Sequence, residues 1–300
     1  MNIEIRSIYP DLINNLTRFM NRNHPPDRFT PALLNEKIFE DKDFSTDLTL
    51  CLYSKDILSG FGMAVLREGG IGYIKLLAVE KGLRRRGLGR AIYNFLERRL
   101  KAGVCRLIRI YNSSPNYLLP GISPELTPAV FFLKHLGFVK YAETCNMKVD
   151  LTDEFFPVES EIKKLESKGI SIRKAQPSDL TELTLFLEED FPAWIAEAEE
   201  MFSGVESTVF IVKKEKRIIG FAGYDANNKG MGWFGPMGVE ERYRGSGIGS
   251  VLLKICLNDM RKKYNRAIIP WVSSPEFYIR AVDARIERTF WQFEKRVQPI

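Results

Sequence analysis

The feature that most constrains the fold of this sequence is an internal repeat. Ile5-Arg6 followed by Pro10-Asp11-Leu12 recurs as Ile172-Arg173 followed by Pro177-Ser178-Asp179-Leu180. Gly87-Leu88-Gly89 recurs as Gly247-Ile248-Gly249, and Ser113-Ser114-Pro115 recurs as Ser273-Ser274-Pro275, both 160 residues later in the chain. Two separated matches in one register indicate a duplicated unit. The 300 residues are therefore expected to form two domains of one kind.

The repeat also predicts the domain bounds. We expect an N-terminal domain over residues 1–151, a linker over 152–169 and a C-terminal domain over 170–300. The linker contains a charged run that is typical of a short helix ended by Gly169. Phe131-Phe132 matches Phe277-Tyr278 at a spacing of 146, so the first copy has 14 extra residues, roughly 116–127. The prolines and the glycine of this insert predict a loop.

Each copy shows the same order of expected elements. Alternating and branched apolar residues predict paired strands, and a further strand then leads through a glycine-rich turn into a long helix. Another strand, another helix and terminal strands complete the copy. Strands and helices in this order indicate an α/β or α+β layer fold. The expected strands before the turn span 48–53 and 60–66 in the first copy and 208–213 and 218–224 in the second; the long helices span 91–102 and 251–263, and the strands after them 105–111 and 267–272.

The two glycine turns predict anion sites. Residues 80–90 contain Arg84-Arg85-Arg86-Gly87-Leu88-Gly89, and residues 240–250 contain Arg244-Gly245-Ser246-Gly247-Ile248-Gly249. The first N–H groups of a helix lack partners inside the helix and lie at its positive end, so they can hold a phosphate. Glycine allows the backbone to approach such a group closely or to adopt positive φ.

A short glycine pattern can also serve only to shape a turn between a strand and a helix. The recurrence of the pattern in matched surroundings makes this purely structural interpretation the weaker one. Neither turn is a P-loop, because no Gly-Lys-Ser/Thr ends it, and neither continues as GxGxxG. The patterns therefore disfavour a nucleoside triphosphate or a dinucleotide as the anion.

At these residues the sequence resembles the GCN5-related N-acetyltransferase (GNAT) superfamily, whose signature is R/Q-x-x-G-x-G/A between a strand and a helix. The family's late F/L-Y-x-x-x-G-F motif has counterparts at 131–138 and 277–284. The tandem arrangement is similar to that of mycothiol synthase. The resemblance implies two GNAT-like domains, each a mixed and mostly antiparallel sheet flanked by helices. It also implies acetyl-CoA as co-substrate, bound in the second copy by Met237, Gly238, Val239, Arg244, Gly245, Gly247, Ile248, Gly249 and Ser250, and in the first by Ala78, Val79, Arg84, Arg85, Gly87, Leu88, Gly89 and Arg90.

The resemblance further suggests which copy is catalytic. Family members often use a tyrosine, the second aromatic residue of the late motif, to protonate the departing thiolate. Tyr278 has that place in the second copy, and its expected counterpart in the first is Phe132, which has no proton to donate. The second copy departs from the motif, because Asp283-Ala284 replaces Gly-Phe. A packed aromatic without a chemical role is the competing interpretation of Tyr278.

The strands before the two turns are also expected to differ. Residues 233–239 of the second copy contain Gly235-Pro236, which predicts a bulge or a splayed strand where family members admit pantetheine. Residues 73–79 of the first copy contain no such interruption.

An acidic segment of the second copy is a candidate wall for the acceptor. Acids surround Phe191 and Trp194 and could receive a cationic amine, although a solvated helix face explains them as well. No side chain stands out as a general base. The acids are Glu188, Glu189, Asp190, Glu197, Glu199 and Glu200.

Composition excludes several other classes. No apolar run is long enough to span a membrane and no apolar segment opens the chain, so we expect a cytoplasmic protein. The four cysteines are dispersed and there are two histidines, so no metal site is expected. The first 150 residues carry 22 Lys+Arg against 15 Asp+Glu, and the second 150 carry 22 against 23. The basic half permits an anionic partner, but no motif or aromatic platform for nucleic acid accompanies it.

The sequence therefore predicts an N-acetyltransferase that moves an acetyl group from acetyl-CoA to the amine of a small molecule, with Tyr278 as general acid. The alternative is an acyl-CoA-binding sensor without turnover. A tandem chain could act as a monomer with internal pseudo-symmetry or as a homodimer.

Overall fold

The computed structural model describes residues 3–24, 27–153, 155–204 and 206–299. The chain forms two compact units. Unit 1 consists of Met1–Thr144 together with Phe290–Ile300, and unit 2 consists of Cys145–Thr289. Each unit is thus built mainly from one copy of the repeat.

Unit 1 contains a sheet in which neighbouring strands follow the order β1-β2-β3-β4-β5, with β12 beside β5. The pairs from β1 to β4 are antiparallel, β4 and β5 are parallel, and β12 is antiparallel to β5. The strands are β1 (Glu4–Arg6), β2 (Thr49–Ser54), β3 (Ile57–Arg67), β4 (Ile71–Val79), β5 (Leu107–Ile110) and β12 (Arg285–Arg296).

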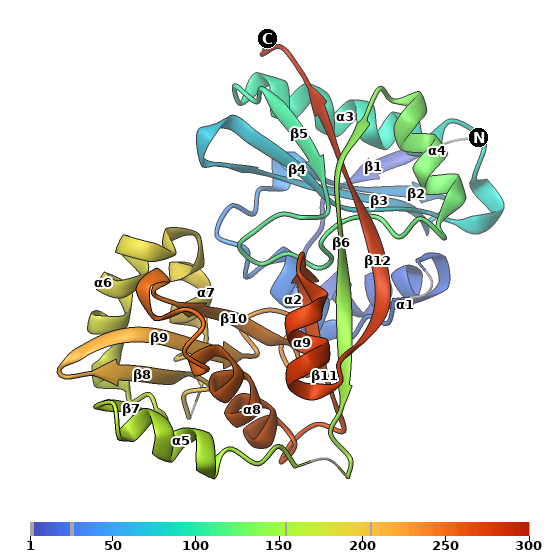
Figure 1. Cartoon of the computed structure of the whole chain (residues 1–300). Helices are drawn as coiled ribbons and strands as arrows, with labels where there is room; N and C mark the ends of the chain where they lie inside the picture. Colours follow the sequence, from blue (N-terminus) through green and yellow to red (C-terminus); the bar gives the residue numbers. More distant parts are fainter. Residues whose placement is uncertain (1–2, 25–26, 154, 205, 300) are drawn as a thin grey trace. The chain divides into compact units, whose positions relative to one another are not determined.

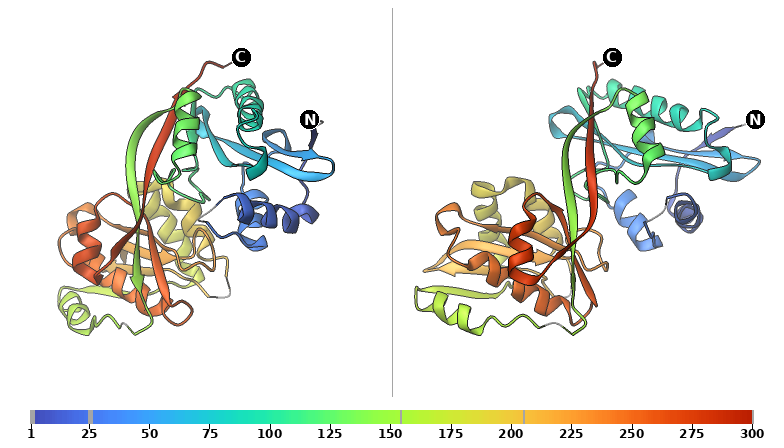
Figure 2. Two further views of the ribbon diagram at one scale, coloured as in Figure 1. Left: turned by 90° about the vertical axis from the view of Figure 1, so that its right-hand side faces the viewer. Right: turned by 45° about the vertical axis from the view of Figure 1, so that its right-hand side comes forward.

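Helices cover both faces of this sheet. Figure 2 shows α3 on one face and α1 and α2 on the other. Gly60 and Gly62 of β3 lie against Ile92 of α3, so the absence of a side chain allows helix and sheet to approach closely. The helices are α1 (Ile13–Asn23), α2 (Pro31–Ile38), α3 (Leu88–Ala102) and α4 (Thr127–His135).

Unit 2 repeats this layout around a sheet of order β10-β9-β8-β7, and a second strand pair is formed by β6 and β11. One core lies under α8 and a smaller one contains Phe186, Leu187 and Phe221. The strands are β6 (Val139–Asp150), β7 (Ile170–Lys174), β8 (Phe210–Lys214), β9 (Arg217–Tyr224), β10 (Phe234–Val239) and β11 (Arg266–Val272). The helices are α5 (Glu159–Glu166), α6 (Leu180–Asp190), α7 (Ile195–Glu200), α8 (Ile248–Met260) and α9 (Pro275–Val282).

The two copies exchange their last strands. The end of β12, from the second copy, pairs with β5 of unit 1, as Glu294↔Arg109 shows. The end of β6, from the first copy, pairs with β11 of unit 2, as Val149↔Ala267 shows. Figure 1 follows both strands, β6 in green and β12 in red. Each sheet is therefore completed by the strand that ends the other copy.

The exchange also completes the two cores. Phe290 and Phe293 of β12 are fully buried in the core of unit 1. Met147 of β6 is fully buried in the core of unit 2. Burial of a Phe or Met side chain contributes about 1.5–3 kcal/mol. Neither unit buries its apolar surface without residues from the other copy.

The insert of the first copy holds the exchanged strand in unit 1. Ile122 forms an antiparallel bridge with Trp291. The Gln292 side chain donates a hydrogen bond of 3.0 Å to the Pro120 carbonyl. Gly121 lies so close to β12 that a Cβ there would be 2.6 Å from the Trp291 carbonyl oxygen. The insert is thus a loop, as predicted, and it packs against the last strand of the second copy.

Most expected elements are present, with small shifts at their ends. The structure confirms a mixed fold in two GNAT-like halves and a short helix in the linker, α5, although linker residue 154 lies outside the described residues. The bounds 1–151 and 170–300 follow the repeat, whereas the compact units place 145–151 in unit 2 and 290–300 in unit 1. This difference arises from the exchange, which no local pattern reports. No helix among the described residues is long and apolar enough to cross a membrane.

Gly121→Val is expected to destabilise the protein by about 1–3 kcal/mol, because the new side chain must push β12 away from the insert. Urea unfolding measures the loss. Gly82→Ala is the matched control, since a Cβ at Gly82 meets nothing within 4 Å. Equal stability of the two variants would show that the insert does not press on the exchanged strand.

Candidate functional site

The two glycine turns have the same backbone conformation. Gly87 and Gly247 precede α3 and α8 with φ of +84° and +93°. Two residues earlier, Arg85 and Gly245 also have positive φ, of +62° and +78°. A Cβ at Gly87 or Gly247 would meet nothing within 4 Å. These glycines are therefore required by the backbone conformation, and the space above each turn is open.

Each turn ends in a helix start whose N–H groups are available. Neither Gly87 nor Gly247 can provide a side-chain cap, and the first intrahelical bonds shown at these starts are Ala91 N–H to Gly87 and Val251 N–H to Gly247. Leu88, Gly89, Ile248 and their neighbours thus present donors at the positive end of a helix dipole. Donors arranged in this way can hold the oxygens of a phosphate group.

Arg84 and Arg244, the arginines of the family signature, bond to the strand that precedes each turn. Arg84 Nε donates to the Val79 carbonyl at 3.0 Å and Arg244 Nε donates to the Val239 carbonyl at 3.3 Å. Arg84 also donates to the Asn23 carbonyl at 2.6 Å. Each guanidinium therefore ties the turn to the end of the preceding strand. In this conformation the bond fixes the turn, and the charge remains close to the anion site.

The two turns differ in charge. Residues 80–90 contain five basic residues and one acidic residue, whereas residues 240–250 contain two of each. In the second turn Glu240 pairs with Arg242 at 2.5 Å. Long-range attraction of an anion is consequently stronger at the first turn. Where the first turn has Arg85, Arg86 and Arg90, the second has the small uncharged residues Gly245, Ser246 and Ser250.

The strands diverge beside each turn. The β4–β5 register ends at Ile74↔Ile110, and the Tyr111 N–H donates to the Ile74 carbonyl, while β4 continues to Val79. In the second copy, Trp233↔Ile268 is an isolated bridge before β10 continues to Val239. The backbone of Ala78 and Val79, and of Met237, Gly238 and Val239, therefore lies beside a gap between diverging strands. A narrow chain such as pantetheine can pair with backbone groups there.

Both diverging strands carry a bulge. The register of β10 with β9 shifts between Phe234 and Met237, around the Gly235-Pro236 peptide, as predicted. The expectation that the first copy lacks an interruption is wrong, because Met63↔Leu76 is followed by Ala64↔Ile74 and Lys75 bulges out. A bulge needs one extra residue and not a Gly or Pro, so composition did not reveal it.

Contacts at the turns correct the pairing of the aromatic residues. A Cβ on Gly89 would be 3.4 Å from Phe132, and one on Gly249 would be 3.6 Å from Phe277. Phe277 is therefore the counterpart of Phe132, and Tyr278 is the counterpart of Leu133. The hydrogen bonds that end the two helices explain this shift. The Ala284 N–H donates to the Tyr278 carbonyl, six residues back, whereas the Phe138 N–H donates to the Leu133 carbonyl, five residues back. The end of α9 therefore contains one residue more than the end of α4. The difference between the two copies remains, because Leu133, like Phe132, has no acidic proton.

Tyr278 lies half-buried at the start of α9. Its ring packs edge-on against Phe277 with centroids 5.0 Å apart. Burial raises the pKa of the Tyr278 hydroxyl above its usual value, which keeps the proton in place at neutral and mildly alkaline pH. Among the described residues, no side chain or backbone group hydrogen-bonds this hydroxyl. The hydroxyl therefore keeps its capacity to donate a hydrogen bond.

The segment expected to form the acceptor wall contains a cluster of aromatic side chains, and some of its acidic side chains are paired with other residues. Phe191 and Trp194 stack with centroids 5.0 Å apart at 14°. Phe191 also lies against Gly238 of β10, where a Cβ would be 2.8 Å from its ring. Glu197 is buried and accepts a hydrogen bond of 2.5 Å from Asn227. The remaining acids lie on helix surfaces, with Glu189 paired with Arg217, Glu200 bonded to Ser203 and Lys229, and Glu188, Asp190 and Glu199 exposed.

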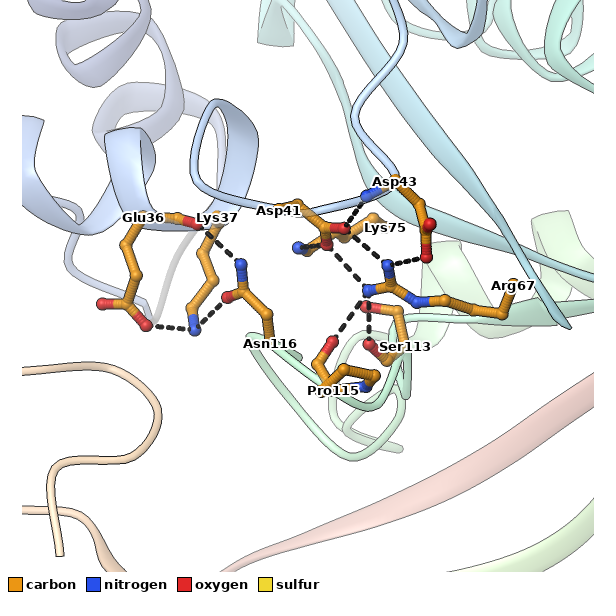
Figure 3. A network of polar contacts seen from close by, with 9 residues as sticks. All are labelled: Glu36, Lys37, Asp41, Asp43, Arg67, Lys75, Ser113, Pro115 and Asn116. Carbon is orange, nitrogen blue, oxygen red and sulfur yellow. Dashed lines mark hydrogen bonds and ion pairs between the residues drawn. The ribbon is translucent and has the colours of Figure 1, made fainter. Parts of the chain in front are cut away.

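A buried ion cluster occupies the corresponding side of the first copy, and sequence reasoning missed it. Asp41, which follows α2, accepts hydrogen bonds from Lys75 and, at 2.5 and 2.7 Å, from Arg67 (Figure 3). Arg67 also reaches Asp43 at 2.5 Å. Burial lowers the pKa of Lys75 to about 7 despite the attraction of Asp41. Burial opposes ionisation of Asp41, but the Arg67 hydrogen bond and the charge of Lys75 outweigh it and hold the pKa of Asp41 below its usual value. In the sequence, the lysine within the apolar run 71–79 was the feature that could have indicated a buried charge.

Within the described part of the chain, no group of three or more His, Cys, Asp or Glu side chains is placed to hold a metal ion. All four cysteines are buried. Burial raises the pKa of the Cys51 thiol to about 12, so this side chain is not a nucleophile at neutral pH.

Comparisons with known proteins agree with this geometry. The family model described as "Acetyltransferase (GNAT) family" matches residues 11–118 and again residues 173–278, together more than half of the chain. No curated protein sequence matches.

Several solved structures share the fold. A GCN5-related glucosamine N-acetyltransferase region of a fungal multi-domain GH3 β-N-acetylglucosaminidase has a TM-score of 0.83 at 16% identity over 98% of this chain, which spans only 38% of that protein. A GCN5-related N-acetyltransferase from Sphaerobacter thermophilus has a TM-score of 0.76 at 16% identity, covering 99% of this chain and 96% of that one. A tandem GNAT protein from the clavulanic acid biosynthesis pathway has a TM-score of 0.71 at 12% identity, covering 100% of both chains. The repeat, the paired turns and the double family match lead to one conclusion: the chain belongs to the acetyltransferase (GNAT) family and carries two copies of its fold in tandem.

Proposed function

We propose that the protein transfers an acetyl group from acetyl-CoA to the amine of a small molecule, and that the second copy carries out the chemistry. The observation that carries this proposal is the position of Tyr278, on the helix that packs over Gly249 of the anion turn. One copy thus combines an anion turn, diverging strands and an available acidic hydroxyl. The first copy has the turn and the strands but has Leu133 in place of the tyrosine.

The turn amides of Gly247, Ile248 and Gly249 would hold the pyrophosphate of acetyl-CoA. Its pantetheine arm would lie beside Met237, Gly238 and Val239, and the bulge of β10 would turn a backbone N–H toward the thioester carbonyl. A donor held there stabilises the negative charge that develops on the carbonyl oxygen during attack. The corresponding residues of the first copy, Ala78, Val79 and Arg84 to Arg90, would bind the same cofactor without the acid.

The transfer itself needs one acid and a neutral amine. The amine nitrogen attacks the thioester carbonyl and forms the new N–C bond, and the C–S bond then breaks. The thiolate takes the proton of the Tyr278 hydroxyl, and the excess proton of the acetylated nitrogen leaves to water, which also restores Tyr278. A tyrosine with a raised pKa is suited to this role because it stays protonated until the thiolate forms.

The acceptor would lie against Phe191 and Trp194. The buried carboxylate of Glu197 and the stacked rings favour an amine joined to an apolar or ring-shaped body. Glucosamine is a sensible first acceptor to test, because the similar fungal region is described as a glucosamine N-acetyltransferase. A sensor that binds acyl-CoA without turnover is the second candidate, favoured by the more basic turn of the first copy.

Tyr278→Phe is expected to lower kcat by a factor of roughly 10² to 10³, because the thiolate loses its positioned proton donor. Release of the CoA thiol, followed with a thiol reagent across a panel of amines, measures the rate. In the unchanged protein the rate should decline only where Tyr278 loses its proton, and burial moves the pKa of this hydroxyl above that of an exposed tyrosine. The variant should lack that alkaline decline.

The control for this experiment is Tyr9→Phe, which removes the hydroxyl of an exposed tyrosine and should leave kcat unchanged. An unchanged kcat and pH profile in Tyr278→Phe would refute the assigned role. Tight binding of acetyl-CoA without thiol release to any amine would favour the sensor.

Gly247→Ala is expected to weaken acetyl-CoA binding by about tenfold, because an L-residue in the left-handed region costs about 1–2 kcal/mol and the turn relaxes away from the phosphate. Titration calorimetry measures the affinity. Gly230→Ala is the control, because Gly230 has a similar φ of +76° and equally open surroundings in a loop. The control should lose stability but keep its affinity, and equal affinities of the two variants would contradict an anion site at this turn.

A further inference from the structure

Two charged residues of the ion cluster, Arg67 and Lys75, are not repeated in the second copy. At the repeat spacing of 160 residues, Arg67 corresponds to Asn227, which bonds the buried Glu197, and Lys75 corresponds to Gly235. The strand registers support this alignment, since Gly60↔Val79 in the first copy matches Gly220↔Val239 in the second. Two cations of one copy are thus replaced by two uncharged residues in the other.

The difference is largest at the bulges. Lys75 and Gly235 are the residues at which the two strand registers shift. The Lys75 side chain is completely buried and is held by the completely buried side chain of Asp41. A Cβ at Gly235 would meet nothing within 4 Å. The bulge of the first copy thus carries a buried lysine side chain, whereas the bulge of the second carries no side chain and has open space directly beside its Cα.

Residues 113–116, which follow β5, pack against the ion cluster of the first copy. Arg67 donates to the Ser113 carbonyl at 3.1 Å and to the Pro115 carbonyl at 2.7 Å. Next in the chain, the Asn116 side chain donates to the Glu36 carbonyl at 2.7 Å (Figure 3). In the second copy the matching Ser273-Ser274-Pro275 leads directly into α9 and Tyr278. One copy thus uses this segment to cover its sheet, and the other uses it to start the helix that carries the acid.

The cluster cannot open at little cost. Asp41 is compensated by both cations, so withdrawal of Lys75 or Arg67 would remove part of that compensation in the interior, and withdrawal of both would leave Asp41 as an unpaired buried charge. Withdrawal of Arg67 would also break its hydrogen bonds to the carbonyls of Ser113 and Pro115. The first copy is therefore held in the closed arrangement.

We infer that the ion cluster of Asp41, Arg67 and Lys75 closes the acceptor side of the first copy, so that only the second copy admits an amine beside a thioester. The second copy has Gly235, with no side chain, at the corresponding bulge. The first copy then binds cofactor without turnover. This inference rests on the proposed function for the identity of the reaction, but the closure of the first copy can be tested without it.

Kinetics of the full chain provide the first test. Asp41→Asn combined with Lys75→Met replaces one buried charge of each sign by similar volumes. We expect a lower Tm, with kcat and the KM for the amine within about twofold of the unchanged protein at a temperature where circular dichroism shows a folded chain. A loss of kcat of tenfold or more in the folded variant would place the chemistry in the first copy and overturn the inference.

Chemical labelling of the unchanged protein provides a test that requires neither a folded variant nor activity. Brief treatment with acetic anhydride, read by mass spectrometry, should modify Lys75 at least about 100 times more slowly than the exposed Lys168, with or without acetyl-CoA. Labelling of Lys75 at a rate close to that of Lys168 would show that the first copy opens, and would overturn the inference.

The two tests separate the inference from the proposed function. If the unchanged protein releases no thiol with any amine, the proposed function fails, and the labelling of Lys75 alone decides whether the first copy is closed. If the Asp41/Lys75 variant loses activity while Tyr278→Phe keeps it, the acetyltransferase stands and the division between the copies is refuted.

Discussion

The structure depends on the exchange of terminal strands between the two copies. A sheet edge exposes unpaired N–H and C=O groups, and a core with a missing strand exposes apolar side chains. Glu294↔Arg109 and Val149↔Ala267 satisfy both needs with residues from the other copy. Because Phe290 and Phe293 complete the first core, the first copy alone would lack part of its interior. The tandem arrangement is thus a requirement of packing.

Within this frame, one backbone design occurs twice. In both copies a bulged strand leads to an arginine that bonds the carbonyl at the end of that strand, and a glycine with positive φ then starts the helix. Duplication preserved the parts that depend on backbone geometry. The side chains placed on this backbone differ, because they are constrained only by what each copy must bind or pack.

The two copies differ in their charged residues and in the side chains near the turn. The first turn is rich in arginine, and its sheet carries buried charges that neutralise one another. The second turn is nearly neutral, and its surroundings contain Tyr278, Phe191 and an unobstructed glycine at the bulge. The first copy therefore has the stronger positive charge at its turn, and the second has the tyrosine and the aromatic residues that the proposed reaction would use.

The sequence alone determined the repeat, the family, the two glycine turns and the mixed fold, because these depend on local spacing and on glycines that the backbone requires. It located Tyr278 but paired it with Phe132, since the extra residue at the end of α9 is visible only in the hydrogen bonds of Ala284 and Phe138. The tertiary structure decided the exchanged strands, the bulge at Lys75 and the ion cluster. Each of these joins residues far apart in the chain, as Asp41 joins Lys75 and Arg109 joins Glu294, and no local pattern specifies which distant groups will share one interior.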